Sequence, residues 1–135
     1  MRNLIIIFAI ATIGIFSSAF PAYSLDTSAP LLCSVTKAIE CSTENSCLEG
    51  TAETYDLPQF VKVDLQGKKI IEVGENTLKR ESEIKNLQQI NNTSIIQGIE
   101  NGRSWSVVIG DEGKMSAAVS GSGVGFIVFG ACISL

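Results

Sequence analysis

The chain has 135 residues, of which 45% are hydrophobic and 18% are charged, and this balance excludes an intrinsically disordered protein. Its formal net charge of −4 disfavours nucleic acid and anionic membrane surfaces as partners. The sequence contains no histidine, which removes imidazole catalysis and most zinc, copper and haem sites, so we expect no cofactor and no metal.

Residues 1–24 have the three regions of a secretory signal peptide. A positive charge at Arg2 precedes the apolar run 4–16, and Ala22-Tyr23-Ser24 supplies small residues at the positions that precede a cut. The apolar run is shorter than the ~20 residues that a helix needs to cross a bilayer. We therefore expect a cleaved signal helix, then a single domain at 25–135 without a membrane span, and a periplasmic or secreted address.

Turn signals recur through the rest of the chain between apolar, β-branched runs, at the spacing of an all-β meander. Asn91-Asn92 and Asn101-Gly102 are the clearest hairpin turns, because Asn and Gly accept the positive φ that tight hairpin turns require. The pattern predicts strands at 31–40, 60–65, 68–73, 93–100, 103–109, 114–120 and 124–133.

Two segments are harder to assign. The polar segment 41–58 is the longest irregular stretch, and segment 77–90 predicts two short strands broken near Ser82-Glu83, although its Glu and Lys content would also suit a helix. The total is eight or nine strands joined by short connections. Because such a meander removes its free edges by closing, we expect a small antiparallel up-and-down β-barrel, with a flattened β-sandwich as the alternative.

Four cysteines, an even number, fall after the signal and indicate two disulfides, for which three connectivities exist. We favour Cys41 with Cys47, which closes a short polar loop, and Cys33 with Cys132, which ties the two ends of the domain together. The second pairing requires the first and last strands to be neighbours.

The alternation of side chains predicts what each face of the sheet contacts. Trp105 and Val107 share one face with Ile109, whereas the small polar side chains between them share the other, as in a wall with a dry inside and a wet outside. The last strand differs, because Phe126 and Val128 face one way and the equally apolar Ile127 and Phe129 face the other. Its outer face is therefore either covered or an exposed apolar patch.

A set of short motifs runs through most of the chain after the signal: Leu32-Cys33, Glu40-Cys41, Leu57-Pro58-Gln59-Phe60, Val63-Asp64, Gly102-Arg103-Ser104-Trp105-Ser106, Gly113 before Met115, and Val128-Phe129-Gly130-Ala131-Cys132. Together they resemble an uncharacterised family of small exported, cysteine-containing β proteins from Gram-negative bacteria, which implies export and a cysteine-bridged β fold. The general build is also similar to that of periplasmic lysozyme inhibitors. Ser120-Gly121-Ser122-Gly123 resembles the serine- and glycine-rich loop of those inhibitors, although the order of aromatic and cysteine positions differs.

Catalysis is not indicated. A serine nucleophile needs a base beside it, and Ser34 and Lys37 do not have the spacing of a Ser–Lys pair. The carboxylates Asp111-Glu112 fall at a hairpin tip, where solvated turn residues are the rule, and Gly121-Ser122-Gly123 lacks the helix and lysine of a phosphate-binding loop. We therefore expect a protein that is not an enzyme.

Aromatic residues and their neighbours supply the candidate binding residues. Trp105 is more typical of a core than of a ligand platform, and Arg103 is expected to be solvated or stacked on a ring. The segment 42–57 with its aromatic surroundings fits equally a binding loop and a lid that plugs one barrel end. The full set is Tyr55, Leu57, Phe60, Arg103, Trp105, Phe126 and Phe129.

Two functions follow as expectations. The preferred one is a periplasmic binding or protein-interaction module that presents segment 42–57, or the last strand, to a protein partner in the cell envelope. The alternative is a carrier that holds a small apolar ligand inside a lipocalin-like barrel, for which strands this short are expected to leave little room. A hydrolase inhibitor of the lysozyme-inhibitor type ranks below both.

Overall fold

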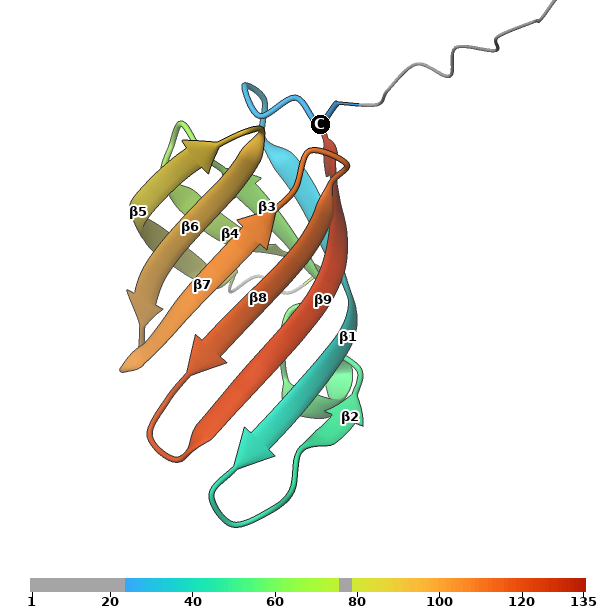
Figure 1. Ribbon diagram of the computed structural model, residues 1–135, viewed down its shortest axis with the longest axis vertical. Helices are drawn as coiled ribbons and strands as arrows, with labels where there is room; N and C mark the ends of the chain where they lie inside the picture. Colours follow the sequence, from blue (N-terminus) through green and yellow to red (C-terminus); the bar gives the residue numbers. More distant parts are fainter. Residues whose placement is uncertain (1–23, 76–78) are drawn as a thin grey trace, which may run out of the picture.

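A computed structural model describes residues 24–75 and 79–135 and places them in an antiparallel β-barrel (Figure 1). The predicted signal peptide therefore lies outside the described residues, except for its last residue. The strands are β1 (Leu31–Ser42), β2 (Leu48–Gly50), β3 (Phe60–Asp64), β4 (Lys69–Val73), β5 (Glu81–Ile90), β6 (Thr93–Glu100), β7 (Arg103–Ile109), β8 (Lys114–Ser120) and β9 (Val124–Ser134), with one 3-10 helix, η1 (Glu53–Tyr55).

The barrel closes where β1 meets β9. The two strands pair antiparallel along their whole length, from Leu31 opposite Ser134 to Ser42 opposite Val124. Cys33 lies directly opposite Cys132 in this register, their Cα atoms are 4.0 Å apart, and their sulfurs are bonded. The predicted barrel and this disulfide are confirmed, and the flattened sandwich is wrong, because pairing of the first and last strands leaves a single closed sheet.

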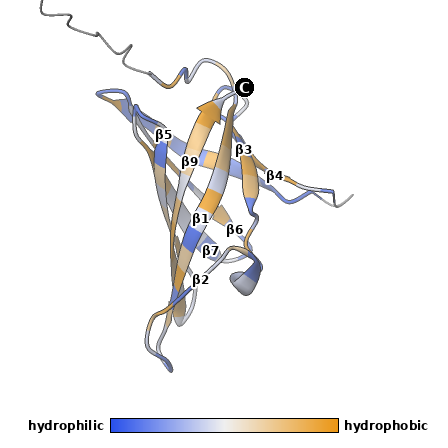
Figure 2. Cartoon of the chain, turned by 90° about the vertical axis from the view of Figure 1, so that its right-hand side faces the viewer, coloured by the Kyte–Doolittle hydropathy of each residue, from blue (hydrophilic) through white to orange (hydrophobic). Residues whose placement is uncertain are grey.

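Strand β1 pairs with β9 on one side and with both β3 and β2 on the other, because β1 is longer than β3. Its first residues pair with β3, whereas its later residues, 38–40, pair with β2. A bulge between Val35 and Lys37 separates the two halves. The predicted Cys41–Cys47 disulfide is confirmed and closes the loop between β1 and β2. Figure 2 shows η1 beside β2, where the chain turns back toward β3.

The prediction of two strands broken near Ser82-Glu83 is wrong. A single strand, β5, runs through both residues and pairs with β4 on one side and β6 on the other. Ser82 and Ile84 are buried while Glu81 and Glu83 are exposed, so the charged residues mark the outer face of a strand and not a turn. The residues 76–78 of that segment lie outside the described part of the chain.

Segment 24–30 and the C-terminus lie together at one end of the barrel (Figure 1). Large apolar side chains fill this end. Leu25 is buried there, and its backbone N–H donates to the carbonyl of Asp111. The carboxylate of Asp26 accepts hydrogen bonds from the hydroxyl and the backbone N–H of Ser28, which lower the pKa of Asp26. The buried side chains at this end are Leu25, Leu31, Val63, Leu65, Ile84, Ile96 and Ile109.

Two disulfides indicate an oxidising compartment outside the cytoplasm, because such bonds are rare where thiols are kept reduced. Among residues 24–75 and 79–135 there is no helix with the length and hydrophobicity needed to cross a membrane.

Candidate functional site: a cavity inside the barrel

The half of the barrel opposite the filled end is hollow. It contains a cavity of about 440 Å³, to which every strand of the closed barrel contributes a side chain. The prediction that short strands leave little room inside is therefore wrong. The apolar lining residues are Val35, Leu57, Pro58, Val61, Ile70, Trp105, Val107, Met115, Ala117, Val119 and Val128, and the polar ones are Glu72, Arg80, Ser82, Glu100, Asn101 and Arg103.

The cavity follows from a change in side-chain size along the strands. Leucine and isoleucine dominate the inward positions at the filled end, whereas Ala117, Val119 and Val128 occupy them in the hollow half. Side chains as small as these do not reach across the barrel axis to the opposite wall, so they leave a space there. The small inward residues of β8 and β9 therefore contribute to the space inside the hollow half.

Trp105 forms one wall of the cavity and is held in a fixed orientation. Its indole Nε1–H donates to the hydroxyl of Ser82 at 3.0 Å, and its side chain is largely buried. A Cβ added to Gly98, the cross-strand partner of Trp105, would lie 2.1 Å from the indole Cζ2, so only glycine leaves room for the ring. The tryptophan is therefore core and cavity wall at once.

Residues 51–58 cover part of the hollow half and form what we call the cover segment. The hydroxyl of Tyr55 donates to the carbonyl of Leu48 at 2.7 Å, and its ring packs edge-on against Phe126, with 5.9 Å between the centroids. Leu57 and Pro58 reach the cavity from this segment. The end of the predicted loop 42–57 therefore lies at the cavity.

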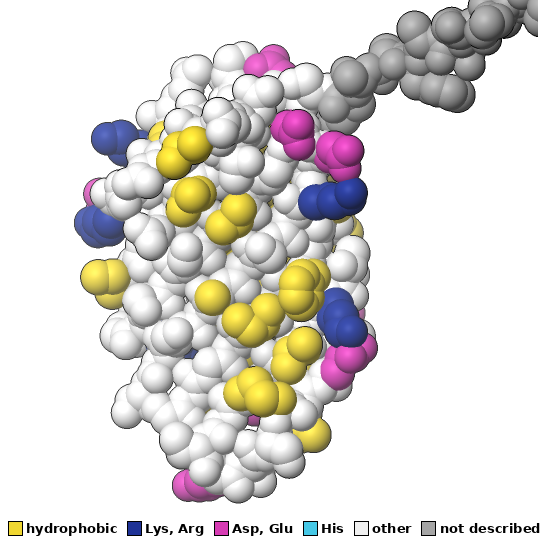
Figure 3. Space-filling view, viewed as in Figure 1, with side chains coloured by type: hydrophobic (Ala, Val, Ile, Leu, Met, Phe, Trp, Pro, Cys, Tyr) yellow, Lys and Arg dark blue, Asp and Glu magenta, His cyan; other side chains and the backbone are white. Residues whose placement is uncertain are grey.

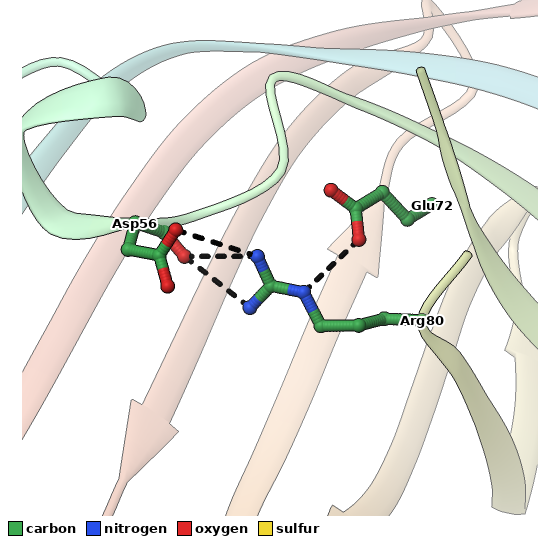
Figure 4. Close-up of polar contacts among 3 residues, drawn as sticks. All are labelled: Asp56, Glu72 and Arg80. Carbon is green, nitrogen blue, oxygen red and sulfur yellow. Dashed lines mark hydrogen bonds and ion pairs between the residues drawn. The ribbon is translucent and has the colours of Figure 1, made fainter. Parts of the chain in front are cut away.

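Arg80 ties the cover segment to the barrel wall (Figure 4). Its two terminal nitrogens each lie 3.3 Å from the carbonyl oxygen of Asp56, and one lies 3.7 Å from the Asp56 carboxylate. Its Nε donates to the carboxylate of Glu72 at 3.0 Å, and only 19% of the Glu72 side chain is exposed. One guanidinium therefore neutralises the charge of Glu72 at the cavity and holds the backbone of the cover segment.

We call the end of the cavity that faces away from the filled end the rim. Glu72 and Arg80 form one charged part of the rim, and Glu100 and Arg103 form the other. They are cross-strand partners at the β6–β7 hairpin, and they occupy the same inward-facing series of positions as Gly98 and Trp105. The antiparallel alternation of strands puts this hairpin at the same end as Glu72 and Arg80. In the described part of the chain, no ion pair within 4.0 Å involves Glu100 or Arg103.

Ion pairs on the surface, away from the cavity, shift the pKa values of two glutamates. A hydrogen bond and the charge of the Lys85 ammonium lower the pKa of Glu83, on the outer face of β5. Lys114 lowers the pKa of Glu112 in the same two ways, at the filled end of the barrel. No three His, Cys, Asp or Glu side chains of the described residues gather into a group that could hold a metal ion.

The structure brings together some of the predicted binding residues and separates others. Leu57, Arg103 and Trp105 line the cavity, and Tyr55 of the cover segment packs on Phe126. Phe60 and Phe129 do not line it. Each is 41% exposed, and each faces away from the barrel axis, on β3 and β9 respectively.

The sequence interpretation missed most of the wall and three of the four charged residues at the rim, Glu72, Arg80 and Glu100. Ala117 and Val107 could have been found, because the alternation of their strands marks them as inward-facing. Arg80 and Glu72 carried no such signal, because their contact joins the ends of two strands across a loop. Comparison of the chain with protein-family models, with curated proteins and with solved structures gave no match.

Proposed function

We propose that this protein binds a small, largely apolar molecule inside its barrel, in the periplasm or after secretion. The observation that carries the proposal is the cavity of about 440 Å³ between apolar walls. Small-molecule sites in proteins have volumes of about 300–1,000 Å³ and are lined mainly by apolar side chains with few polar groups. This ranks the carrier hypothesis above the interaction module that the sequence favoured.

Filling the cavity is expected to abolish binding of an apolar probe. Trp105 is the only tryptophan and lies in the cavity wall, so N-phenyl-naphthylamine bound inside should accept energy from it and quench its fluorescence. Ala117→Phe places a ring in the cavity and should weaken binding at least tenfold. Ala118→Phe adds the same ring to the next residue, whose side chain faces outward, and should bind like the original protein.

The outcome decides between a cavity and a surface site. If Ala117→Phe and Ala118→Phe both lost probe binding to the same extent, or both retained it, the probe would bind elsewhere on the barrel. An original protein whose tryptophan emission does not change at micromolar probe would contradict the proposal directly. Near-ultraviolet circular dichroism of the variants reports whether the barrel packing is retained.

A second candidate, an interaction module for a protein partner in the envelope, is favoured by one observation. On the outside of β7, β8 and β9, where hydrophobic side chains gather in Figure 3, Ala118 lies opposite Ile127, and Ser116 lies between Val108 and Phe129. Ile127 and Phe129 are each 41% exposed. Exposed apolar patches of this kind mark protein contacts more often than isolated apolar residues do.

Phe129→Ser should remove a protein partner that binds this outer patch. Phe60→Ser is the matched control, because Phe60 has the same 41% exposure on a different part of the barrel. We expect native mass spectrometry of the protein purified from the periplasm to retain the partner with Phe60→Ser and to lose it with Phe129→Ser. A monomer without a retained partner in all three proteins would contradict this second function.

A further inference from the structure

We propose that the ligand is a single-chain amphiphile with a zwitterionic head, whose chain lies in the cavity and whose head lies at the rim between Glu100 and Arg103. This inference rests on the proposed function and narrows it to a class of molecule. Three observations support it: the distribution of polar groups around the cavity, the neutralisation of two charges within the protein, and the position of the two remaining charges, Glu100 and Arg103.

The lining divides into an apolar body and a charged end. The charged lining residues Glu72, Arg80, Glu100 and Arg103 come from strand ends or from the residue before a strand, all at one end of the barrel. The polar side chain among the walls, Ser82, already accepts the indole hydrogen bond. A purely apolar molecule would cover rim charges and leave them without water, whereas an amphiphile can hold its polar end there.

Two of the four rim charges are used within the protein. Arg80 donates a hydrogen bond to the carboxylate of Glu72, so the opposite charges of this pair cancel and attract a charged ligand little. Arg80 also binds the backbone of the cover segment. Glu100 and Arg103 have no such partners among the described residues. The residues outside the described ranges contain no Asp or Glu, so Arg103 gains no carboxylate from them. The head group is therefore recognised at the β6–β7 hairpin.

The two remaining charges have opposite signs and neighbouring positions. A guanidinium presents a planar set of donors that fits a phosphate or carboxylate group. The carboxylate of Glu100 beside it repels a second negative charge and attracts a positive one. The stem of the exposed Arg103 side chain lies along the β8–β9 turn, since a Cβ added to Gly121 would lie 3.2 Å from its Cγ. This arrangement is complementary to a head that carries both charges.

Three probes with the same dodecyl chain test the head group: dodecylphosphocholine, dodecanoate and dodecyltrimethylammonium, each below its micelle concentration and at low salt. Displacement of N-phenyl-naphthylamine from the protein that comprises residues 25–135 gives the affinities. We expect dodecylphosphocholine to bind about tenfold more tightly than either singly charged probe. Arg103→Gln should weaken dodecanoate and strengthen dodecyltrimethylammonium, and Glu100→Gln should do the reverse, while both weaken the zwitterion.

Glu112→Gln is the control, since it removes one carboxylate at the filled end of the barrel and should leave all three affinities unchanged. Equal binding of the three probes to the original protein, or the same effect of both rim variants on every probe, would overturn the head assignment while the cavity proposal stands. Failure of all probes, including N-phenyl-naphthylamine, would instead contradict the proposed function. The comparison of probes on the original protein decides the matter even where a variant does not fold.

Discussion

Replacement of Cys33 and Cys132 together by alanine is expected to lower the free energy of unfolding by about 4 to 5 kcal/mol. The bond joins residues separated by 99 positions. In the chain-entropy account, a disulfide that closes a loop of that length lowers the entropy of the unfolded chain and stabilises the folded protein by about 4.7 kcal/mol. Both sulfurs are buried at the seam between β1 and β9, so the substitution also removes packing there. A loss of this size is comparable to the whole stability of a small domain.

Urea denaturation followed by circular dichroism measures the effect, with the paired replacement of Cys41 and Cys47 as control. That bond spans a sequence separation of only 6, so its removal should cost about 2 kcal/mol. If the two paired variants lost the same stability, the closure of the barrel would not depend on the long-range bond.

Trp105→Ala is expected to lower the free energy of unfolding by about 3 to 5 kcal/mol, the usual range for removal of a buried tryptophan. The side chain is 9% exposed and packs against Gly98, which has no side chain to fill the space left behind. The variant would also leave the hydroxyl of Ser82 without its donor. The cavity would widen toward β5 and β6, so the barrel wall would lose contacts on both strands.

Ser82→Ala separates the hydrogen bond from the packing. It keeps the indole but removes its acceptor, and an unpaired buried donor costs about 1 to 3 kcal/mol. Thermal and urea denaturation of both variants should therefore rank them with Trp105→Ala the less stable. A Ser82→Ala variant as unstable as Trp105→Ala would contradict the account, because the ring itself would then contribute nothing.

Much of the barrel could be predicted because its signals are local. Asn91, Asn92, Asn101 and Gly102 all have positive φ in the structure, as the hairpin turns predicted at these positions require. The strands on either side of them match the predicted ranges at 93–100 and 103–109. The pairing of Cys33 with Cys132 then supplied the one long-range contact needed to close the sheet.

The cavity could not be predicted in the same way. Alternation assigns Trp105 and Val107 to the inside, yet it does not say which side chains meet across the barrel axis, and that decides whether the inside is filled. The contact of Arg80 with Asp56 joins segments that no periodic pattern relates. Charged residues also misled the assignment of β5, because its glutamates lie on the wet face of a continuous strand.

The seam between β1 and β9 also constrains the order of events as the chain is made. Synthesis starts at the N-terminus, so Cys33, Cys41 and Cys47 all emerge while Cys132 has yet to be added. If Cys33 first forms a disulfide with Cys41 or Cys47, another thiolate must attack that disulfide and exchange it before the native bond to Cys132 can form. We therefore expect a higher yield of the native pairing when oxidant is supplied after the last strand is complete.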